Sequence, residues 1–303
     1  MIENHPRDMI GYGANPPDPK WPNGARLALS FVLNYEEGGE YNILLGDAHS
    51  ESYLCEIVGL PELEGKRNCF TEDIFEYGSR AGAWRILRLF NERNLTLTVY
   101  AVGLALELNP EIGRAFADGG HETASHAYRW INYADMSEED ERDDIRKAVA
   151  AIKKTTGNRP VGNYTGRYSP NTRRLIVEEG GFIYDSDAYN DDLPYWVVVE
   201  GKPHLVIPYD LCNNDFKFSL SPGWMSADDF FQYLKNSFDV LYDEGEIAPK
   251  MMSVGLHGRL GGRPGRASAI ARFLDHVQNY DDVWICRRMD IAHHWIENSP
   301  YKA

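Results

Sequence analysis

The chain has 303 residues, of which 43% are hydrophobic and 25% are charged. These values are ordinary for a globular protein, and a chain of this length can bury a core without a disulfide or metal staple. The formal charge of −15 and the lack of a long basic run argue against nucleic acid and acidic membrane surfaces as partners.

The cysteines and the N-terminal sequence indicate the cellular compartment. Cys55, Cys69, Cys212 and Cys286 show no C-x-x-C spacing, so we expect reduced thiols rather than a disulfide framework. The segment from Met1 to Arg7 has no apolar signal core, and no stretch reaches the roughly 18 apolar residues of a membrane helix. We therefore expect a cytoplasmic protein with no membrane partner.

Strand and helix patterns alternate along most of the chain. Residues 1–24, rich in glycine and proline towards their end, are expected to form an N-terminal arm, and residues 37–72 a long loop that is functional or part of a subunit contact. Strands are expected at 26–34, 95–102, 122–125, 160–165, 182–185, 205–208, 250–257 and 283–287, with helices at 74–93, 104–118, 137–156, 171–179, 227–244, 267–280 and 289–298. This alternation predicts one α/β barrel-like domain over residues 25–303.

Polar residues follow several of the predicted strands. In a barrel, the carboxyl ends of the strands form the active-site face. Glu36 and Glu37 follow the first strand, His126 follows the strand at 122–125, and His257 ends the strand at 250–257. These side chains are therefore expected to converge at one rim.

Each of these residues also has a purely structural interpretation. The two glutamates could form a solvated turn, and His126 could be a satisfied core histidine. Asp185 and Asp187, after the strand at 182–185, could cap the following turn.

Other catalytic motifs are incomplete in this chain. His121–Ser125 (HETAS) fails as a zinc motif, because the second histidine of H-E-x-x-H is replaced by Ser125. Gly261–Arg266 (GGRPGR) lacks the G-K-[ST] ending of a phosphate loop, and no G-x-S-x-G motif is present. The sequence therefore does not predict nucleotide binding or covalent catalysis.

In order and spacing, the carboxylate pair, His126 and the late Leu256-His257 resemble the polysaccharide deacetylase (NodB-like) superfamily over roughly residues 25–298. The resemblance implies a single distorted (β/α) barrel that hydrolyses an amide-type C–N bond. In the family pattern, one carboxylate acts as base and the next binds a metal. Two histidines four residues apart complete the metal site, and a late histidine acts as acid.

The chain departs from that pattern at the metal site. The carboxylate pair is Glu36-Glu37, and Trp130 stands four residues after His126, where the second metal histidine is expected. An indole nitrogen only donates, whereas a catalytic zinc needs about three protein ligands. We therefore expect no metal and no other cofactor. The family's arginine loop is also replaced, with Arg167 as its nearest arginine.

Three further segments resemble one branch of the superfamily, the metal-independent allantoinases. They are Tyr168–Thr172 (YSPNT), Tyr184–Trp196 (YDSDAYNDDLPYW) and Leu256–Arg266 (LHGRLGGRPGR). The resemblance implies hydrolytic opening of the hydantoin ring of allantoin to allantoate, in purine and uric acid degradation. It also implies a small-molecule substrate and a homo-oligomer, with a tetramer as the expected state.

Roles for individual residues follow from hydrolysis of a cyclic amide. Glu36 is expected to be the base, with its pKa raised by the neighbouring charge of Glu37, and His257 the acid or oxyanion partner. An aspartate of the 185–192 segment is expected to orient His257. The side chains expected to contact the substrate are Glu37, His126, Trp130, Arg167 and Asp187.

Two other hypotheses stay open at this point. A metal-dependent deacetylase of N-acetylated sugars, or another cyclic-amide hydrolase, would share the same barrel. A binding protein that kept only the pocket would also lack a complete metal site, although it would not need to retain Glu36 and His257.

Overall fold

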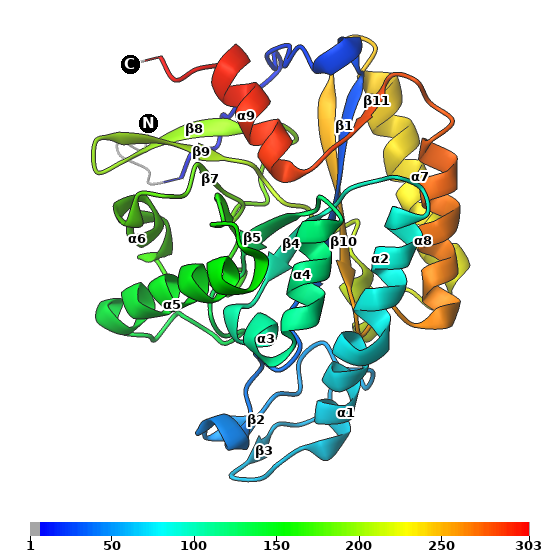
Figure 1. Ribbon diagram of the computed structural model, residues 1–303. Coiled ribbons are helices and arrows are strands. Elements are labelled where there is room, and N and C mark those ends of the chain that lie inside the picture. The colour runs from blue at the N-terminus through cyan, green and yellow to red at the C-terminus, as the bar shows by residue number, and fades with distance from the viewer. Residues whose placement is uncertain (1–6, 303) are drawn as a thin grey trace.

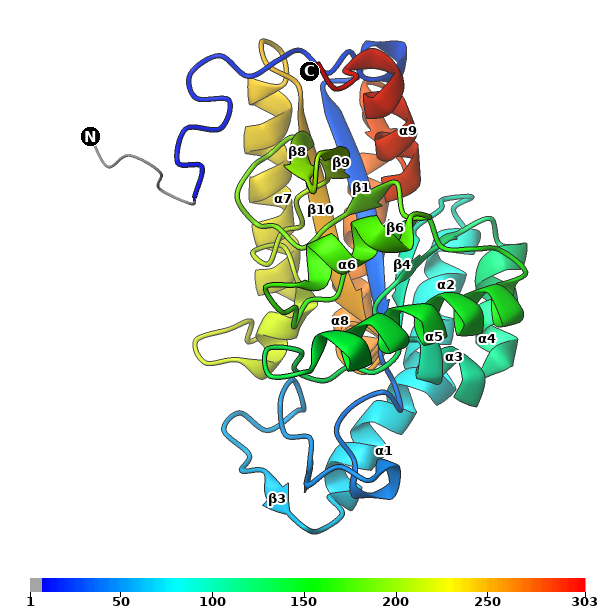
Figure 2. The ribbon, with the colours of Figure 1, turned by 90° about the vertical axis from the view of Figure 1, so that its left-hand side faces the viewer.

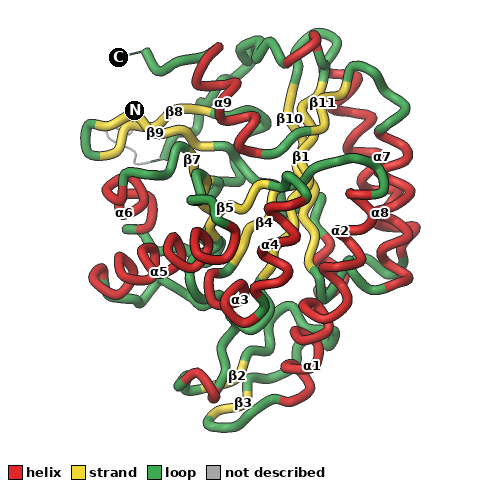
Figure 3. Tube along the Cα trace, in the orientation of Figure 1, coloured by secondary structure: helices red, strands yellow, loops and turns green. Residues whose placement is uncertain are grey.

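The computed structural model describes residues 7–302, which form a curled sheet surrounded by helices (Figures 1 and 3). Residues 1–6, which belong to the predicted arm and to the segment searched for a signal core, lie outside the described residues, as does residue 303. The fold confirms the predicted α/β class, with a parallel sheet that curls into a distorted half-barrel. Among the described residues, no helix has both the length and the apolar character needed to cross a membrane.

The elements have the following bounds. The strands are β1 (Leu27–Tyr35), β2 (His49–Ser50), β3 (Leu63–Glu64), β4 (Thr98–Ala101), β5 (Glu122–Ser125), β6 (Gly162–Asn163), β7 (Tyr184–Asp185), β8 (Tyr195–Val199), β9 (Lys202–Val206), β10 (Lys250–His257) and β11 (Val283–Ile285). The α-helices are α1 (Cys69–Tyr77), α2 (Ala83–Asn91), α3 (Gly103–Leu108), α4 (Pro110–Asp118), α5 (Glu138–Thr156), α6 (Thr172–Glu179), α7 (Ala227–Glu244), α8 (Pro264–Val277) and α9 (Arg288–Asn298).

The main sheet has the strand order β10-β1-β4-β5-β6-β7-β9-β8, and β11 also pairs with β1. All these pairs are parallel except β8–β9. The register places Asn34 of β1 opposite His257 of β10 and Tyr100 of β4. The carboxyl ends of these strands therefore lie at one edge, as the barrel rule requires.

Strand β1 is buried on both faces, which is typical of a parallel strand covered by helices. On its outer face, the ring of Phe31 packs at 5.2 Å from Phe90 of α2 and at 6.0 Å from Phe273 of α8. On its inner face, Val32 belongs to a cluster with the tyrosines of the barrel interior, including Tyr100. This strand therefore holds the residue that follows it, Glu36, at the centre of the fold.

Several predicted elements differ from the observed ones. The predicted helix at 104–118 is two helices, because Asn109 caps Ile112 N and Pro110 begins α4 as its first residue. The predicted helix at 74–93 begins at Cys69 and contains a π-helical turn at Gly78–Gly82, which joins α1 to α2. The predicted strand at 205–208 belongs to a β8–β9 hairpin whose first strand was not predicted.

The 37–72 segment extends beyond the carboxyl ends of β1 and β10 (Figures 1 and 2). It contains the short β2–β3 pair and a 3-10 helix at Ile43–Leu45. The described part of the arm lies at the opposite end, where the buried Trp21 ring is 5.8 Å from the Trp284 ring and 6.1 Å from the Trp295 ring. The long segment is therefore positioned to cover a site at the strand ends.

Candidate active site

Glu36 follows β1 directly and is 2% exposed. Its Oε1 lies 3.2 Å from His126 Nε2 and 3.5 Å from His257 Nε2, and its Oε2 lies 2.6 Å from Arg259 Nη2. Burial alone would raise the pKa of Glu36, but the charges of Arg259 and His257 and the hydrogen bond from His126 outweigh it and hold this pKa well below its ordinary value. Glu36 is therefore an ionised carboxylate among cationic groups.

His257 ends β10 and faces Glu36 from the neighbouring strand. Its Nδ1 lies 2.7 Å from Asp215 Oδ1, while its backbone N–H and that of Gly261 donate to Asp215 Oδ2. Burial would lower the pKa of His257, but the charges of Glu36 and Asp215 raise it to about 9. The raised pKa favours a protonated His257 at neutral pH, and the contacts with Asp215 hold its ring in one orientation.

The carboxylate that orients His257 was predicted in the wrong segment. Asp215, the first residue of a 3-10 helix at Asp215–Ser219, makes this contact, rather than an aspartate of 185–192. Its only sequence signal is its position in the loop after the strand at 205–208. Asp187 instead accepts hydrogen bonds from the backbone N–H groups of Thr165 and Gly166.

Asp187 and His126 both contact the backbone of the loop after β6. His126 Nδ1 lies 2.6 Å from the carbonyl oxygen of Tyr164, and the two rings stack at 5.1 Å. The other ring nitrogen faces Glu36, so both contacts are hydrogen bonds only when the ring carries two N–H groups. Burial and the charge of Asp185 raise the pKa of Asp187 to about 7. Asp187 thus supports the loop against which His126 rests.

Glu37 has an environment opposite to that of Glu36. Its Oε2 accepts a hydrogen bond from the Glu36 backbone N–H, and its Oε1 occupies space where a side chain on Gly78 or Gly258 would clash. Burial is the main cause that raises the pKa of Glu37 to about 7; it outweighs the opposing charge of Arg259, and the charge of Glu36 adds a smaller increase. The expected pKa increase in this pair thus occurs at Glu37, and not at Glu36.

The glycines beside Glu37 bring two backbones into direct contact. A Cβ atom on Gly82 would collide with the Gly258 carbonyl, and one on Gly262 would collide with Gly82. The π-helical turn between α1 and α2 therefore packs directly against the loop after β10, with no side chain between them.

Trp130 and Arg167 form a layered wall with Tyr53. The Arg167 guanidinium lies 3.8 Å from the centre of the Trp130 ring and 5.2 Å from that of Tyr53, and the two rings are nearly parallel. Arg167 Nη1 also pairs with Glu51 Oε2 at 3.0 Å. The 37–72 segment thus supplies one side of the site through Glu51 and Tyr53.

These side chains enclose a cavity of about 180 Å³. Its lining consists of Asn34, Glu36, Tyr53, Leu54, His126, Trp130, Tyr164, Gly166, Arg167, Tyr189, Tyr209, Leu211, Asn214, Phe216 and His257. Of the residues predicted from the sequence, Glu36, His126, Trp130, Arg167 and His257 are brought together there. Glu37 and Asp187 lie outside this lining, as far as residues 7–302 define it, so their predicted substrate contacts are not seen.

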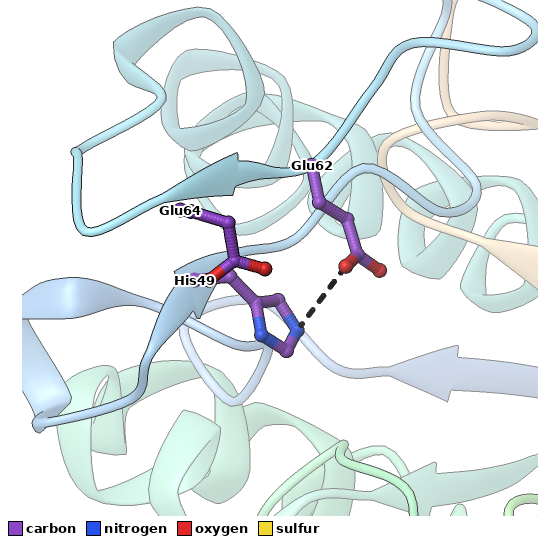
Figure 4. A group of neighbouring side chains, drawn as sticks. All are labelled: His49, Glu62 and Glu64. Atoms are coloured by element: carbon purple, nitrogen blue, oxygen red, sulfur yellow. Dashed lines mark ion pairs between the residues drawn. The ribbon is translucent and has the colours of Figure 1, made fainter.

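A wider cavity of about 750 Å³ lies on the outer side and shares Tyr53, Gly166 and Arg167 with the first. Among its lining residues are His49 and Glu62, whose Nε2 and Oε2 atoms are 3.9 Å apart. With Glu64, they form a group whose possible metal-ligating atoms lie within 4.8 Å of one another (Figure 4). Both glutamates are exposed, and His49 and Glu62 line the outer cavity rather than the site of Glu36.

Comparisons with known proteins agree with this architecture. Residues 73–180 match the polysaccharide deacetylase family. A Schizosaccharomyces pombe protein assigned to the polysaccharide deacetylases is 43% identical over 98% of this chain and 99% of its own length.

Two crystal structures are similar over nearly the whole chain. That of PuuE allantoinase is 55% identical, with a TM-score of 0.97, and the match covers 99% of this chain and 100% of that one. That of a Pseudomonas aeruginosa protein described as a polysaccharide deacetylase is 56% identical, with a TM-score of 0.96 and coverage of 98% and 100%. Sequence, fold and strand-end site therefore agree, and the chain is a hydrolase that belongs to the polysaccharide deacetylase family.

Proposed function

We propose that the protein is an allantoinase, which hydrolyses the hydantoin ring of allantoin to give allantoate in purine and uric acid degradation. The observation that carries the proposal is the contact between the Glu36 carboxylate and the protonated His257, 3.5 Å apart in a small cavity. The 55% identity to PuuE allantoinase, over nearly the full length of both chains, supports the choice of substrate.

The size and cover of the cavity favour a small, flat substrate. Sites for drug-sized ligands usually measure about 300–1,000 Å³, whereas this one measures about 180 Å³. Tyr53 and Leu54 of the 37–72 segment also line it, so this segment covers part of the site, which supports a small substrate over a sugar polymer. Trp130 lines the cavity as an apolar wall, and the Arg167 guanidinium stacks on its ring.

General acid–base catalysis accounts for the reaction. Glu36 accepts a proton from a water molecule whose oxygen adds to the ring carbonyl carbon. The carbonyl π electrons move to its oxygen, and they return as the C–N bond breaks. His257, held by Asp215, donates its Nε2 proton to the leaving nitrogen. Arg167 donates to a carbonyl oxygen of the bound ring and holds the substrate in position.

The family pattern implies a catalytic metal, but the residues present do not fit one. Trp130 has no lone pair to donate, and the Glu37 carboxylate is turned towards its own backbone and the glycines around it. The Arg259 guanidinium already contacts Glu36. Because a catalytic zinc needs about three protein ligands and an open position, we propose that the reaction proceeds without a metal or other cofactor.

Two further expectations concern the protein in the cell. The homotetramer and the cytoplasmic location stay predictions. In support of a subunit contact, the 37–72 segment exposes the apolar side chains of Leu44, Ile57 and Val58.

The decisive experiment measures allantoin hydrolysis after treatment with a strong chelator, with the metal content of the same sample quantified. We expect full activity with negligible metal. In the same assay, Glu36→Gln should lower kcat by about 100-fold or more, because it removes the base. Activity that returns only with zinc would favour the alternative, a metal-dependent deacetylase-type site. Absence of allantoin turnover in both samples would refute the proposed substrate.

A further inference from the structure

We propose that Arg259 is the resident cation of this site and takes the place of a metal ion beside the carboxylate pair. The proposal rests on the allantoinase function only for its kinetic test. Arg259 acts through Glu36, so it is a positioning residue rather than a catalytic one. It was not among the residues predicted to form the site, although it lies two positions after His257.

The guanidinium lies against both carboxylates on the side away from the cavity. Its Nη2 is 2.6 Å from Glu36 Oε2, and its Nη1 is 4.0 Å from Glu37 Oε1. Arg259 is 0% exposed, and the described residues that line the inner cavity do not include it. A buried guanidinium is always charged, so these two carboxylates have a permanent positive partner that solvent does not screen.

Three segments fix the guanidinium in place. The backbone of Arg259 belongs to the loop after β10, and its Nε donates to the carbonyl oxygen of Leu54 in the 37–72 segment at 3.1 Å. Its Cζ lies 4.1 Å from the centre of the Phe75 ring in α1 and 5.2 Å from that of Trp130. The cation thus lies beside the carboxylate pair and next to position 130, where the family pattern implies a metal and its second histidine.

The two oxygens of Glu36 therefore have separate partners. Oε2 faces Arg259, whereas Oε1 faces His126 and His257, which line the cavity. With Oε2 held by the guanidinium, Oε1 is the oxygen that faces the reaction space. Removal of the cation would leave two adjacent buried carboxylates without a positive partner on that side, an arrangement of high energy.

The contact depends on charge more than on donor geometry. Within the described part of the chain, Nη1 and Nη2 of Arg259 and Oε2 of Glu36 have no well-aligned hydrogen bond, although the ion pair is short. A lysine at position 259 should therefore replace much of the effect, whereas a methionine of similar length should not.

The first test measures Zn²⁺ binding by calorimetry and needs no enzymatic activity. Trp130→His alone should bind Zn²⁺ no better than the wild type, because the guanidinium still fills the space. Trp130→His combined with Arg259→Met should bind one Zn²⁺ per chain at least about tenfold more tightly than Trp130→His does. Equal affinity in these two variants, or no gain over the wild type in the double variant, would overturn the proposal.

The second test keeps the proposal falsifiable if the double variant does not fold. Arg259→Met should lower kcat for allantoin by about 100-fold, with KM changed by less than about threefold. The kcat of Arg259→Lys should be at least about tenfold higher than that of Arg259→Met. Arg263→Met, on the same loop, is the matched control and should keep wild-type kinetics. Equal activity of the Met and Lys variants would overturn the proposal. An inactive wild type would instead refute the allantoinase function and leave the Zn²⁺ test in force.

Discussion

Glu36 and Glu37 are identical side chains at adjacent positions, yet the fold shifts their pKa values in opposite directions. Glu36 lies among Arg259, His126 and His257, which together outweigh the cost of burying its charge. Glu37 is equally buried, but its carboxylate faces backbone and glycines, and burial raises its pKa to about 7. The short contacts of Glu36 with Arg259 and His257, rather than repulsion between the two carboxylates, therefore make Glu36 the ionised base of the pair.

Asp215 should control the alkaline limit of activity. His257, with a pKa raised to about 9, acts in its protonated form, so kcat/KM should fall as the pH rises through that value. Asp215→Asn removes one of the charges that raise this pKa, and the alkaline limb should move down by about 1–3 pH units. The check is a pH profile of kcat/KM, with the exposed Asp228→Asn as a control. An unmoved limb in Asp215→Asn would exclude this role.

At the residue scale, the sequence predicts the polar side chains directly at strand ends and misses two that tertiary packing brings to the site. Glu36, His126 and His257 all adjoin strand ends, where the barrel rule predicts function. Asp215 and Arg259 are recruited by tertiary packing. An arginine in a glycine-rich loop has the local pattern of a solvated residue, and only the folded structure buries it against Phe75.

The 37–72 segment is held over the site by ion pairs from two neighbouring loops. Arg129 donates to the carbonyl oxygen of Gly39 at 3.0 Å and pairs with Asp47 at 2.6 Å. Arg167 pairs with Glu51 while its guanidinium stacks on Trp130. A segment with little regular structure is thus fixed by charge at two points along its length, which is consistent with the predicted functional role.

Loss of the Glu51–Arg167 pair should affect substrate binding more than chemistry. Glu51→Gln releases the guanidinium from its fixed position above Trp130, but does not touch Glu36 or His257. We expect KM for allantoin to rise about tenfold, or ~1.4 kcal/mol of binding, with kcat nearly unchanged. Steady-state kinetics measure this, and Glu62→Gln in the same segment is the control. A fall in kcat with unchanged KM would contradict it.

Among the elements, β8 was missed although its sequence carries a strand signal. The run Tyr195–Val199 consists of aromatic and β-branched residues, which favour a strand, and its two-residue turn at Glu200-Gly201 has positive φ at both positions. Helices α5 and α7 were predicted to within a residue, because Ser137 and Ser226 cap them with their side chains.

Over the whole molecule, burial of carboxyl groups links stability to pH. Desolvation is the main cause that raises the pKa of Glu37, Glu40 and Asp187 to about 7, and that of Asp144 to about 6. Each group has a higher pKa in the folded chain than in the unfolded one. Its contribution to stability is therefore complete below the unfolded pKa and is lost as the pH rises through the folded value.

The free energy of unfolding should accordingly be larger at pH 6 than at pH 8, by on the order of a few kcal/mol. Glu36 does not contribute to this difference, because its low pKa keeps it ionised at both pH 6 and pH 8. Urea unfolding at both pH values provides the measurement. Asp187→Asn keeps an acceptor for the Thr165 and Gly166 N–H groups and should reduce the difference. Equal stability at the two pH values would contradict the prediction.

The fold class was predictable as a whole because each parallel strand needs helical cover on its outer side. The structure at the two edges of the sheet was not predictable from that rule. One end turns into the antiparallel β8–β9 hairpin, and beside β10 the chain returns to form a single bridge from Asn214 to Gly255. That bridge also brings the neighbouring Asp215 to His257. The detail of the site therefore depends on the irregular closure of the sheet.

The direct backbone contact between Gly82 and Gly258 has a consequence for how this enzyme could change over evolution. That wall of the site contains His257 and Arg259 but has no spare volume, because any side chain at the glycines would collide with backbone. Substitutions that enlarge or reshape the cavity should therefore accumulate on its other sides, which include Tyr53, Arg167, Tyr189 and Leu211. New substrate ranges should arise there, while the catalytic wall remains unchanged.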